Sequence, residues 1–181
     1  MLNKNSCVLT VIDIQDKLMP RNAAAVNQFL QRVIKLIRCA QLLEIPILVT
    51  EQNPGKLGGT NDQVAGVLGD APRYGKMEFG CLENADVHEA VKQQGRKQLL
   101  IVGMEGHICI MQTVLRALEE GYETYVVADC IMSRDAEECR AGLARMDKAG
   151  ATLVTSEMAI FEVLKGAGTD DFRRLLPLLK G

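Results

Sequence analysis

Two side chains with the chemistry for covalent catalysis lie where predicted strands end. Asp13 follows the apolar run Cys7–Ile12, where a carboxylate is costly to bury unless it is paired or hydrogen-bonded. Cys109 follows a glycine-flanked turn, in the first turn of a helix predicted over His107–Glu120. The positive end of that helix favours an anion and predicts a lowered thiol pKa. Backbone N–H groups at the same place can hold a developing oxyanion.

A thiol nucleophile needs a proton acceptor, and the two histidines of the sequence are poorly placed for that role. His107 lies two residues before Cys109 on the same predicted helix, so the two side chains point to nearly opposite sides. His88 falls on the polar side of a predicted surface helix. Asp13, from a neighbouring strand end, is the better base, and Lys76 can supply a supporting cation.

Each of these three residues also has a structural interpretation. Asp13 can accept backbone N–H bonds in a loop or cap a helical turn. Cys109 can be a buried thiol, as free cysteine is among the most buried residue types. Lys76 taken alone reads as a solvated surface lysine. Position in the sequence leaves both interpretations open for all three.

The elements that position these residues alternate between strands and helices. Short apolar runs rich in β-branched residues predict strands at Cys7–Ile12, Ile45–Thr50, Gln98–Val102, Glu123–Ala128 and Ala151–Thr155. Apolar spacing typical of amphipathic helices predicts helices at Ala24–Leu43, Asn84–Gln94, His107–Glu120, Asp135–Gly150, Ser156–Lys165 and Asp170–Leu179. This alternation predicts an α/β fold in which helices cover both faces of a parallel sheet. We expect one domain over residues 1–181, because no linker or repeat interrupts the pattern.

The stretch from Glu51 to Gly80 differs in composition from the rest. Seven of the sixteen glycines fall there, which is unusual because long irregular segments in compact domains mostly serve a site. We therefore expect loops around a pocket, with a short strand or helix among them. Ligands of parallel sheets bind at the carboxyl ends of the strands. Candidate substrate-binding residues near these ends are Gln15, Glu51, Gln52 and Phe79.

The composition excludes several classes of protein. A hydrophobic fraction of 48% and a charged fraction of 24% are ordinary for a globular protein. A net charge of −2 leaves no electrostatic footprint for nucleic acid, and no apolar run approaches the roughly 18 residues of a membrane helix. The six cysteines show no CxxC spacing, which disfavours zinc and thioredoxin-type chemistry. We expect a cytoplasmic protein with reduced thiols and neither cofactor nor metal.

Three motifs together resemble the isochorismatase-like cysteine hydrolase family. They are Val11–Gln15 (VIDIQ), Gly75–Phe79 (GKMEF) and Gly103–Thr113 (GMEGHICIMQT). The resemblance covers nearly the whole chain and is closest to the isochorismatase domain-containing proteins. It implies a three-layer α/β/α, Rossmann-like fold with a parallel sheet of about six strands. It also implies a catalytic triad of Asp13, Lys76 and Cys109.

The resemblance further implies a mechanism. Asp13 takes the thiol proton, Lys76 supports the pair, and Cys109 attacks a carbonyl to form a thioester-type intermediate that water hydrolyses. The backbone N–H groups of Glu105 and Cys109 are the implied oxyanion hole, next to an implied cis peptide at Met104–Glu105. The implied partners are a small-molecule substrate and further copies of the chain in a homo-oligomer.

Positions where this sequence departs from the motifs of related enzymes limit the reactions that the resemblance implies. Two rival functions stay open. The metal-binding aspartate and histidines of nicotinamidases are absent near the second strand, where this chain reads Glu51-Gln52-Asn53-Pro54. Isochorismate vinyl ether hydrolases need no cysteine, so the triad favours cleavage of an amide-like C–N bond. One rival is a catalytically silent binding or scaffold protein on the same fold. The other is a haloacid-dehalogenase-type phosphotransferase, which usually has a second aspartate where this chain has Gln15.

Overall fold

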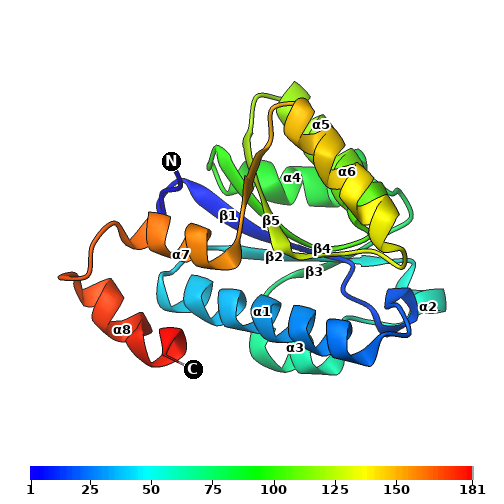
Figure 1. Cartoon of the computed structure of the whole chain (residues 1–181). Coiled ribbons are helices and arrows are strands. Elements are labelled where there is room, and N and C mark those ends of the chain that lie inside the picture. The colour runs from blue at the N-terminus through cyan, green and yellow to red at the C-terminus, as the bar shows by residue number, and fades with distance from the viewer. Residues whose placement is uncertain (181) are drawn as a thin grey trace.

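Six parallel strands form one sheet in the order β3-β2-β1-β4-β5-β6 (Figure 1). The computed structural model describes residues 1–180. Its strands are β1 (Cys7–Ile12), β2 (Ile47–Gln52), β3 (Arg73–Lys76), β4 (Gln98–Met104), β5 (Glu123–Met132) and β6 (Thr152–Val154). Strands β2 and β3 lie on one side of β1, and β4, β5 and β6 lie on the other. The direction of the strand order therefore reverses between β1 and β4, where parallel sheets bind their ligands.

Helices cover both faces of this sheet, which confirms the predicted three-layer α/β/α architecture. The longer helices are α1 (Ala23–Leu42), α3 (Asp62–Leu68), α4 (Ala85–Gln93), α5 (Met111–Glu119), α6 (Ala136–Lys148), α7 (Ser156–Leu164) and α8 (Asp170–Leu179). The core on one face is built by α1, α3, α7 and α8, and the core on the other by α4, α5 and α6 (Figure 1). No helix within residues 1–180 combines the length and apolar character needed to span a membrane.

The central strands are buried along their whole length. Every residue of β1 and β4 is buried, as expected for strands covered on both faces. β5 is longer than predicted and reaches Met132, because its end pairs with the end of β4 after a register shift. Asp129 interrupts the apolar pattern of β5, so the sequence pattern did not predict the part of the strand beyond Ala128. The structure compensates for the partial burial of Asp129, since its carboxylate accepts hydrogen bonds from Ser156 N at 2.7 Å and Ser156 Oγ at 2.8 Å.

The glycine-rich stretch contains short elements, as expected. It holds α2 (Pro54–Leu57), α3 and the edge strand β3. Sequence patterns alone did not locate β3, because Arg73–Lys76 has no apolar run and only Lys76 is buried. Pairing of β3 with β2 brings Lys76 level with Gln52 at the end of the neighbouring strand. The fold thus delivers Lys76 to the same sheet edge as Asp13.

Gly103 is the position where the sheet tolerates no side chain. Its φ is +127°, and a β-carbon there would lie 1.9 Å from the carbonyl oxygen of Ile12. We expect Gly103→Ala to lower the free energy of unfolding by about 3–5 kcal/mol, through backbone strain and overpacking against β1. Urea unfolding followed by circular dichroism measures this. Gly95→Ala is the matched control for positive φ, since open space surrounds Gly95. Equal losses in the two variants would contradict the close-approach argument.

Candidate active site

Asp13 is buried, and both its backbone and its carboxylate are hydrogen-bonded to Thr50 of β2. It follows β1 directly and adopts a left-handed backbone conformation with φ of +51°. Its N–H donates to the Thr50 carbonyl at 3.0 Å, and its Oδ1 accepts the Thr50 hydroxyl at 2.8 Å. Its Oδ2 accepts Lys76 Nζ at 2.6 Å. Residues with such strained backbone conformations are found mostly at functional sites, where the surrounding structure holds them in place.

Lys76 is fully buried beside Asp13, so the interpretation of a solvated surface lysine is wrong. Its ammonium donates to four oxygens: Asp13 Oδ2 at 2.6 Å, Gln52 Oε1 at 2.6 Å, Glu78 O at 3.1 Å and Phe79 O at 3.2 Å. Burial alone would lower the pKa of Lys76, but the negative charge that Cys81, Asp13 and Cys109 can carry raises it overall. Lys76 therefore stays charged. Its three protons are already shared among four acceptors, so it has no free donor for a ligand.

Cys109 lies on a π-helical segment, Gly106–Ile110, between β4 and α5. The preceding Met104–Glu105 peptide is cis. Cys109 is buried, with only 4% of the residue exposed. Burial, the largest cause, and the negative charge of Asp13 together raise the pKa of Cys109 to about 12, against the opposing charge of Lys76. The expectation of a lowered thiol pKa is thus wrong, because burial and Asp13 outweigh any helix-end effect, and α5 itself begins two residues later.

The structure brings Asp13 and Lys76 into direct contact and places Cys109 within their electrostatic influence. At neutral pH the thiol is protonated, because its pKa lies far above that value. Attack by this sulfur therefore requires a group that removes the proton as the reaction proceeds. Asp13 is the anion with the strongest influence on the pKa of Cys109. Each oxygen of its carboxylate accepts one hydrogen bond and has a second lone pair that can accept a proton.

Three of the four candidate substrate-binding residues have side chains that are already hydrogen-bonded within the protein. Gln15 is buried, and its amide joins the Gln52 backbone and the Gly58 carbonyl. Gln52 holds Lys76 Nζ and the Met77 carbonyl. The Glu51 carboxylate accepts both the N–H and the hydroxyl of Thr60. Phe79 is 55% exposed. These bonds explain how the loops are fixed around Asp13 and Lys76.

The buried Glu105 and the partly buried His107 form a polar group beside the cysteine turn, the segment Gly106–Ile110 that carries Cys109. The Glu105 carboxylate accepts from Arg134 Nε at 3.3 Å and lies 3.6 Å from His107 Nδ1. His107 Nδ1 is also 3.0 Å from the Ser133 hydroxyl. Within residues 1–180 the other carboxylate oxygen, Glu105 Oε1, has no hydrogen-bond partner. His107 is thus engaged away from Cys109, in line with its exclusion as the base.

Sequence patterns missed two buried threonines that hold the site together. Thr113 Oγ1 accepts from Cys81 N at 2.9 Å and donates to the Cys109 carbonyl at 2.7 Å, so it joins the two cysteine backbones. Thr50 contacts Asp13 and lies 3.6 Å from Cys81 Sγ. Burial is the main reason that the pKa of Cys81 is raised to about 11. Single threonines within apolar elements carry no sequence signal of such roles.

No set of three His, Cys, Asp or Glu side chains within residues 1–180 is arranged to hold a metal ion. All six cysteines are free thiols. The residues around Asp13 are instead a threonine, a lysine and a glutamine. Such a set suits proton transfer to and from a carboxylate.

The buried thiols predict loss of stability at alkaline pH. Burial raises the pKa of Cys7, Cys39 and Cys81 from 9.0 to about 11. Below pH 9 both states keep these protons, and the stabilisation is complete. Between pH 9 and 11 the unfolded chain releases them while the folded chain retains them, so the free energy of unfolding falls by on the order of 1 kcal/mol per thiol and pH unit.

Urea midpoints measured with reductant at pH 7, 8, 9 and 10 test this. The midpoint should hold to pH 8 and then fall. Cys39→Ala removes one thiol on α1, and its midpoint should fall less steeply. An unchanged wild-type midpoint from pH 8 to 10 would refute the prediction.

Comparison with known proteins gives a consistent result. The model of the Isochorismatase domain matches residues 7–158. Isochorismatase domain-containing protein 2A of Mus musculus is 32% identical over 178 residues, 97% of this chain and 83% of that protein. Secreted isochorismatase effector Isc1 of Phytophthora sojae is 33% identical over 149 residues, 80% of this chain and 71% of that protein.

Solved structures share the fold along its length. A structure described as MAR1 ribonuclease from Caenorhabditis elegans has a TM-score of 0.89 and 29% identity, covering 99% of this chain and 92% of that one. YcaC from Pseudomonas aeruginosa, solved with hexane-2,5-diol and covalent acrylamide, has a TM-score of 0.87 and 25% identity. The aligned region covers 98% of this chain and 90% of that one.

Proposed function

This chain belongs to the isochorismatase family, whose members are generally hydrolases, and we propose that it is a cysteine hydrolase acting on a small-molecule C–N bond of the amide type. The observation that carries the proposal is the buried Asp13–Lys76 ion pair beside a protonated Cys109 thiol. A buried ion pair is a poor way to stabilise a fold, because desolvation offsets much of the attraction. Such groups at the carboxyl ends of strands are better explained by chemistry.

The proposed reaction has two halves. In the first, Asp13 takes the thiol proton as Cys109 sulfur attacks the carbonyl carbon, and the backbone N–H groups of Glu105 and Cys109 hold the oxyanion. The protonated Asp13 then gives its proton to the leaving nitrogen, so ammonia or an amine departs and a thioester remains. In the second, water attacks the thioester with Asp13 as base. The acid is released and the thiol recovers its proton.

Lys76 supports this cycle without touching the substrate. Its protons are directed to Asp13, Gln52 and two backbone carbonyls. It keeps Asp13 oriented, and its charge stabilises the thiolate as it forms. Gln15, Glu51, Gln52 and Phe79 shape the loops around this pair, and we propose no direct substrate contact for their side chains.

A panel of primary amides with ammonia detection tests the proposal. Wild-type protein should release ammonia from at least one amide, and Cys109→Ala should not. Acrylamide offers a second probe, because YcaC of Pseudomonas aeruginosa was solved with it bound covalently. We expect acrylamide to modify Cys109 in this chain. Ammonia release that persists in Cys109→Ala would overturn the proposal.

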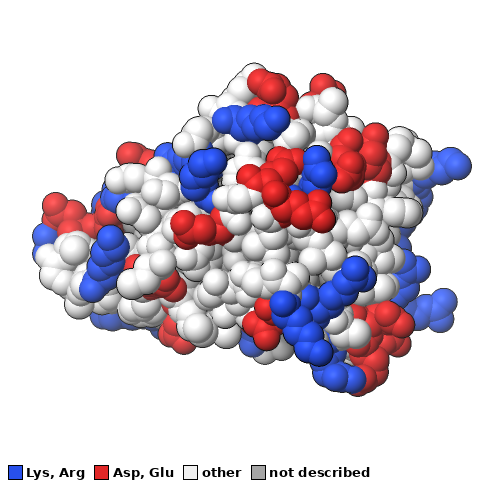
Figure 2. Space-filling view, turned by 90° about the horizontal axis from the view of Figure 1, so that it is seen from above, with Lys and Arg blue, Asp and Glu red and all other residues white. Residues whose placement is uncertain are grey.

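Four rival functions are each set against an observation or a test. Isochorismate cleavage is the activity suggested by the name of Isc1, and it should not depend on Cys109. Ribonuclease activity is suggested by the name of the Caenorhabditis elegans structure. The net charge here is −2, and Figure 2 shows Lys and Arg interspersed with Asp and Glu, which is unlike a nucleic-acid surface. A protein that binds amides without hydrolysing them would bind the amide and release no ammonia. A phosphotransferase of the dehalogenase type would release phosphate with Mg²⁺ after loss of Cys109.

The exposed apolar side chains and the free thiols suggest an oligomeric state and a cellular compartment for the protein. Met77, Phe79, Met158 and Phe161 are exposed, and we propose that such apolar side chains are covered in a homo-oligomer. Six free thiols fit a reducing compartment, so the proposed location is the cytoplasm. We propose that residues 1–181 act as one domain. Light scattering during size-exclusion chromatography gives the number of subunits.

A further inference from the structure

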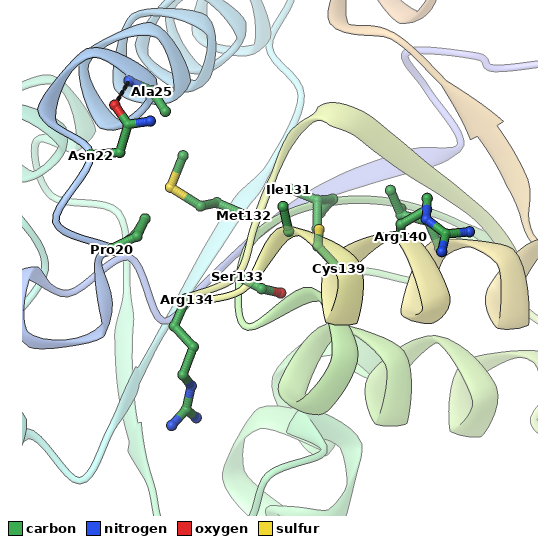
Figure 3. A pocket seen from close by; sticks show the side chains of 11 residues that line it. Pro20, Asn22, Ala25, Ile131, Met132, Ser133, Arg134, Cys139 and Arg140 are labelled. Carbon is green, nitrogen blue, oxygen red and sulfur yellow. Dashed lines mark hydrogen bonds between the residues drawn. The ribbon is translucent and has the colours of Figure 1, made fainter.

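A cavity of about 470 Å³ lies beside the cysteine turn, and neither the triad nor its supporting residues use it. Its walls come from the start of α1, from the end of β5 and from α6 (Figure 3). The wall near α1 includes Pro20 and Asn22, which follow the β1 loop. The cavity thus spans the two halves of the sheet where the strand order reverses, and its size is typical of small-molecule sites.

The cavity shares a wall with the segment that carries Cys109. A β-carbon on Gly106 would lie 2.8 Å from Ile131 Cγ2 and 3.0 Å from Cys139 Sγ, so both side chains contact that glycine directly. Gly106 precedes Cys109 by three residues, about one helical turn. The sheet register also sets Met132 opposite Met104, next to the proposed oxyanion donor Glu105. The part of the cavity wall formed by Ile131, Met132 and Cys139 therefore lies against the segment that carries Cys109.

The cavity walls are largely apolar, and the charges on them belong to two arginines that are paired with carboxylates. Ile131, Met132 and Leu143 supply apolar surface. The two arginines at the cavity are already paired, Arg134 with Glu105 at 3.3 Å and Arg140 with Glu137 at 2.5 Å. No unpaired charge among the lining residues is left to attract an ion. Neutral polar groups remain, and Figure 3 shows Asn22 and Ser133 on opposite walls.

From these observations we infer that the cavity binds the apolar acyl group of a neutral amide, whose carbonyl then reaches Cys109. The inference rests on the proposed function and deepens it, since it names the substrate class. Uncharged aliphatic or aromatic amides of medium length fit the cavity. Amides with a free carboxylate or amine would bury an unpaired charge against Ile131 and Met132, which is unfavourable.

A matched set of amides tests the substrate class. The kcat/KM for hexanamide and benzamide should exceed that for acetamide by at least about tenfold, and adipamate, with its carboxylate, should be no better than acetamide. Leu143→Asp places a charge in the cavity wall and should lower the ratio of hexanamide to acetamide at least about tenfold. Ala144→Asp is the control, because Ala144 is exposed on the same helix outside the cavity.

A second readout needs no turnover. Cys139 lines the cavity and is the one cysteine among the six that is not fully buried. Burial raises its pKa, so labelling with N-ethylmaleimide is run at about pH 8.5 and followed by peptide mass spectrometry. In Cys109→Ala protein, hexanamide should slow labelling of Cys139, and acetamide at equal concentration should not. Leu143→Asp should abolish the protection.

The outcomes separate the two proposals. Cys109-dependent ammonia release with no chain-length preference and no protection of Cys139 overturns the cavity assignment and leaves the hydrolase standing. Protection of Cys139 without ammonia release supports the cavity and overturns the hydrolase. If Leu143→Asp changes the molecular mass in solution while the hexanamide-to-acetamide ratio stays the same, a second copy covers the cavity and the inference fails.

Discussion

Replacing Cys109 with serine is expected to lower kcat/KM on the cleaved amide by at least ~10³-fold, since loss of a covalent nucleophile leaves only binding and oxyanion stabilisation. A serine hydroxyl is the smallest change to the buried thiol, and it keeps a proton that Asp13 can accept. Its intrinsic pKa is much higher than that of a thiol, so Asp13 cannot activate it as well. Initial rates of ammonia release measure the effect.

The control for this variant is Cys39→Ala, which removes a buried thiol on α1, outside the site. It should retain wild-type kcat/KM even if its stability falls. If Cys109→Ser and wild type had nearly equal activity, Cys109 would not be the nucleophile. Equal losses in both variants would point to a general effect of thiol removal on the fold.

Replacing Asp13 with asparagine should separate thiol acidity from catalysis. Burial and then the Asp13 charge raise the pKa of Cys109 to about 12, while Lys76 lowers it. Without the carboxylate the Lys76 ammonium is unopposed, so the thiol pKa should fall and the thiolate fraction at pH 8 should rise. Activity should nevertheless fall by about 10²–10⁴-fold, since no base accepts the thiol proton and no acid protonates the leaving nitrogen.

Two measurements read this variant: the pH dependence of Cys109 alkylation and the kcat/KM for the amide. The account requires opposite changes in the two. A higher thiol pKa together with lower activity would contradict it, and so would undiminished turnover.

Stability controls for Asp13→Asn are necessary because the change leaves Lys76 buried without its anion. Breaking a buried pair on one side costs about 3–5 kcal/mol. Lys76→Met removes the other charge, and the double variant should be more stable than the sum of the two single losses predicts. If the double variant folds but is inactive, its inactivity can be assigned to the missing ion pair rather than to loss of the fold.

Sequence patterns predicted most of the fold, because its signals are local. The runs CVLTVI and QLLIV are buried on both faces, and an apolar run of that kind has few alternatives to a central parallel strand. The edge strand β3 escaped detection because Arg73–Lys76 packs through strand pairing and has little apolar surface. The extension of β5 escaped because Asp129 is satisfied by Ser156, a partner 27 residues away.

The candidate site was predictable in its residue types and less so in its physical state. Asp13 at a strand end and Cys109 after a glycine turn are visible from position alone. The protonated state of the thiol is not, because it depends on burial by distant elements and on the charge of Asp13. The cavity beside Gly106 was missed for a similar reason: Met132 and Leu143 become neighbours only when β5 and α6 pack together.

The most direct test of the central claim is the mass of the enzyme quenched with acid during turnover of a primary amide. Attack by Cys109 with loss of ammonia predicts an added mass equal to that of the amide minus ammonia, located on the peptide that contains Cys109. One ammonia should appear for each modified enzyme before steady turnover begins. Turnover with no added mass on that peptide, accompanied by unreduced ammonia release from Cys109→Ala, would contradict covalent catalysis by Cys109.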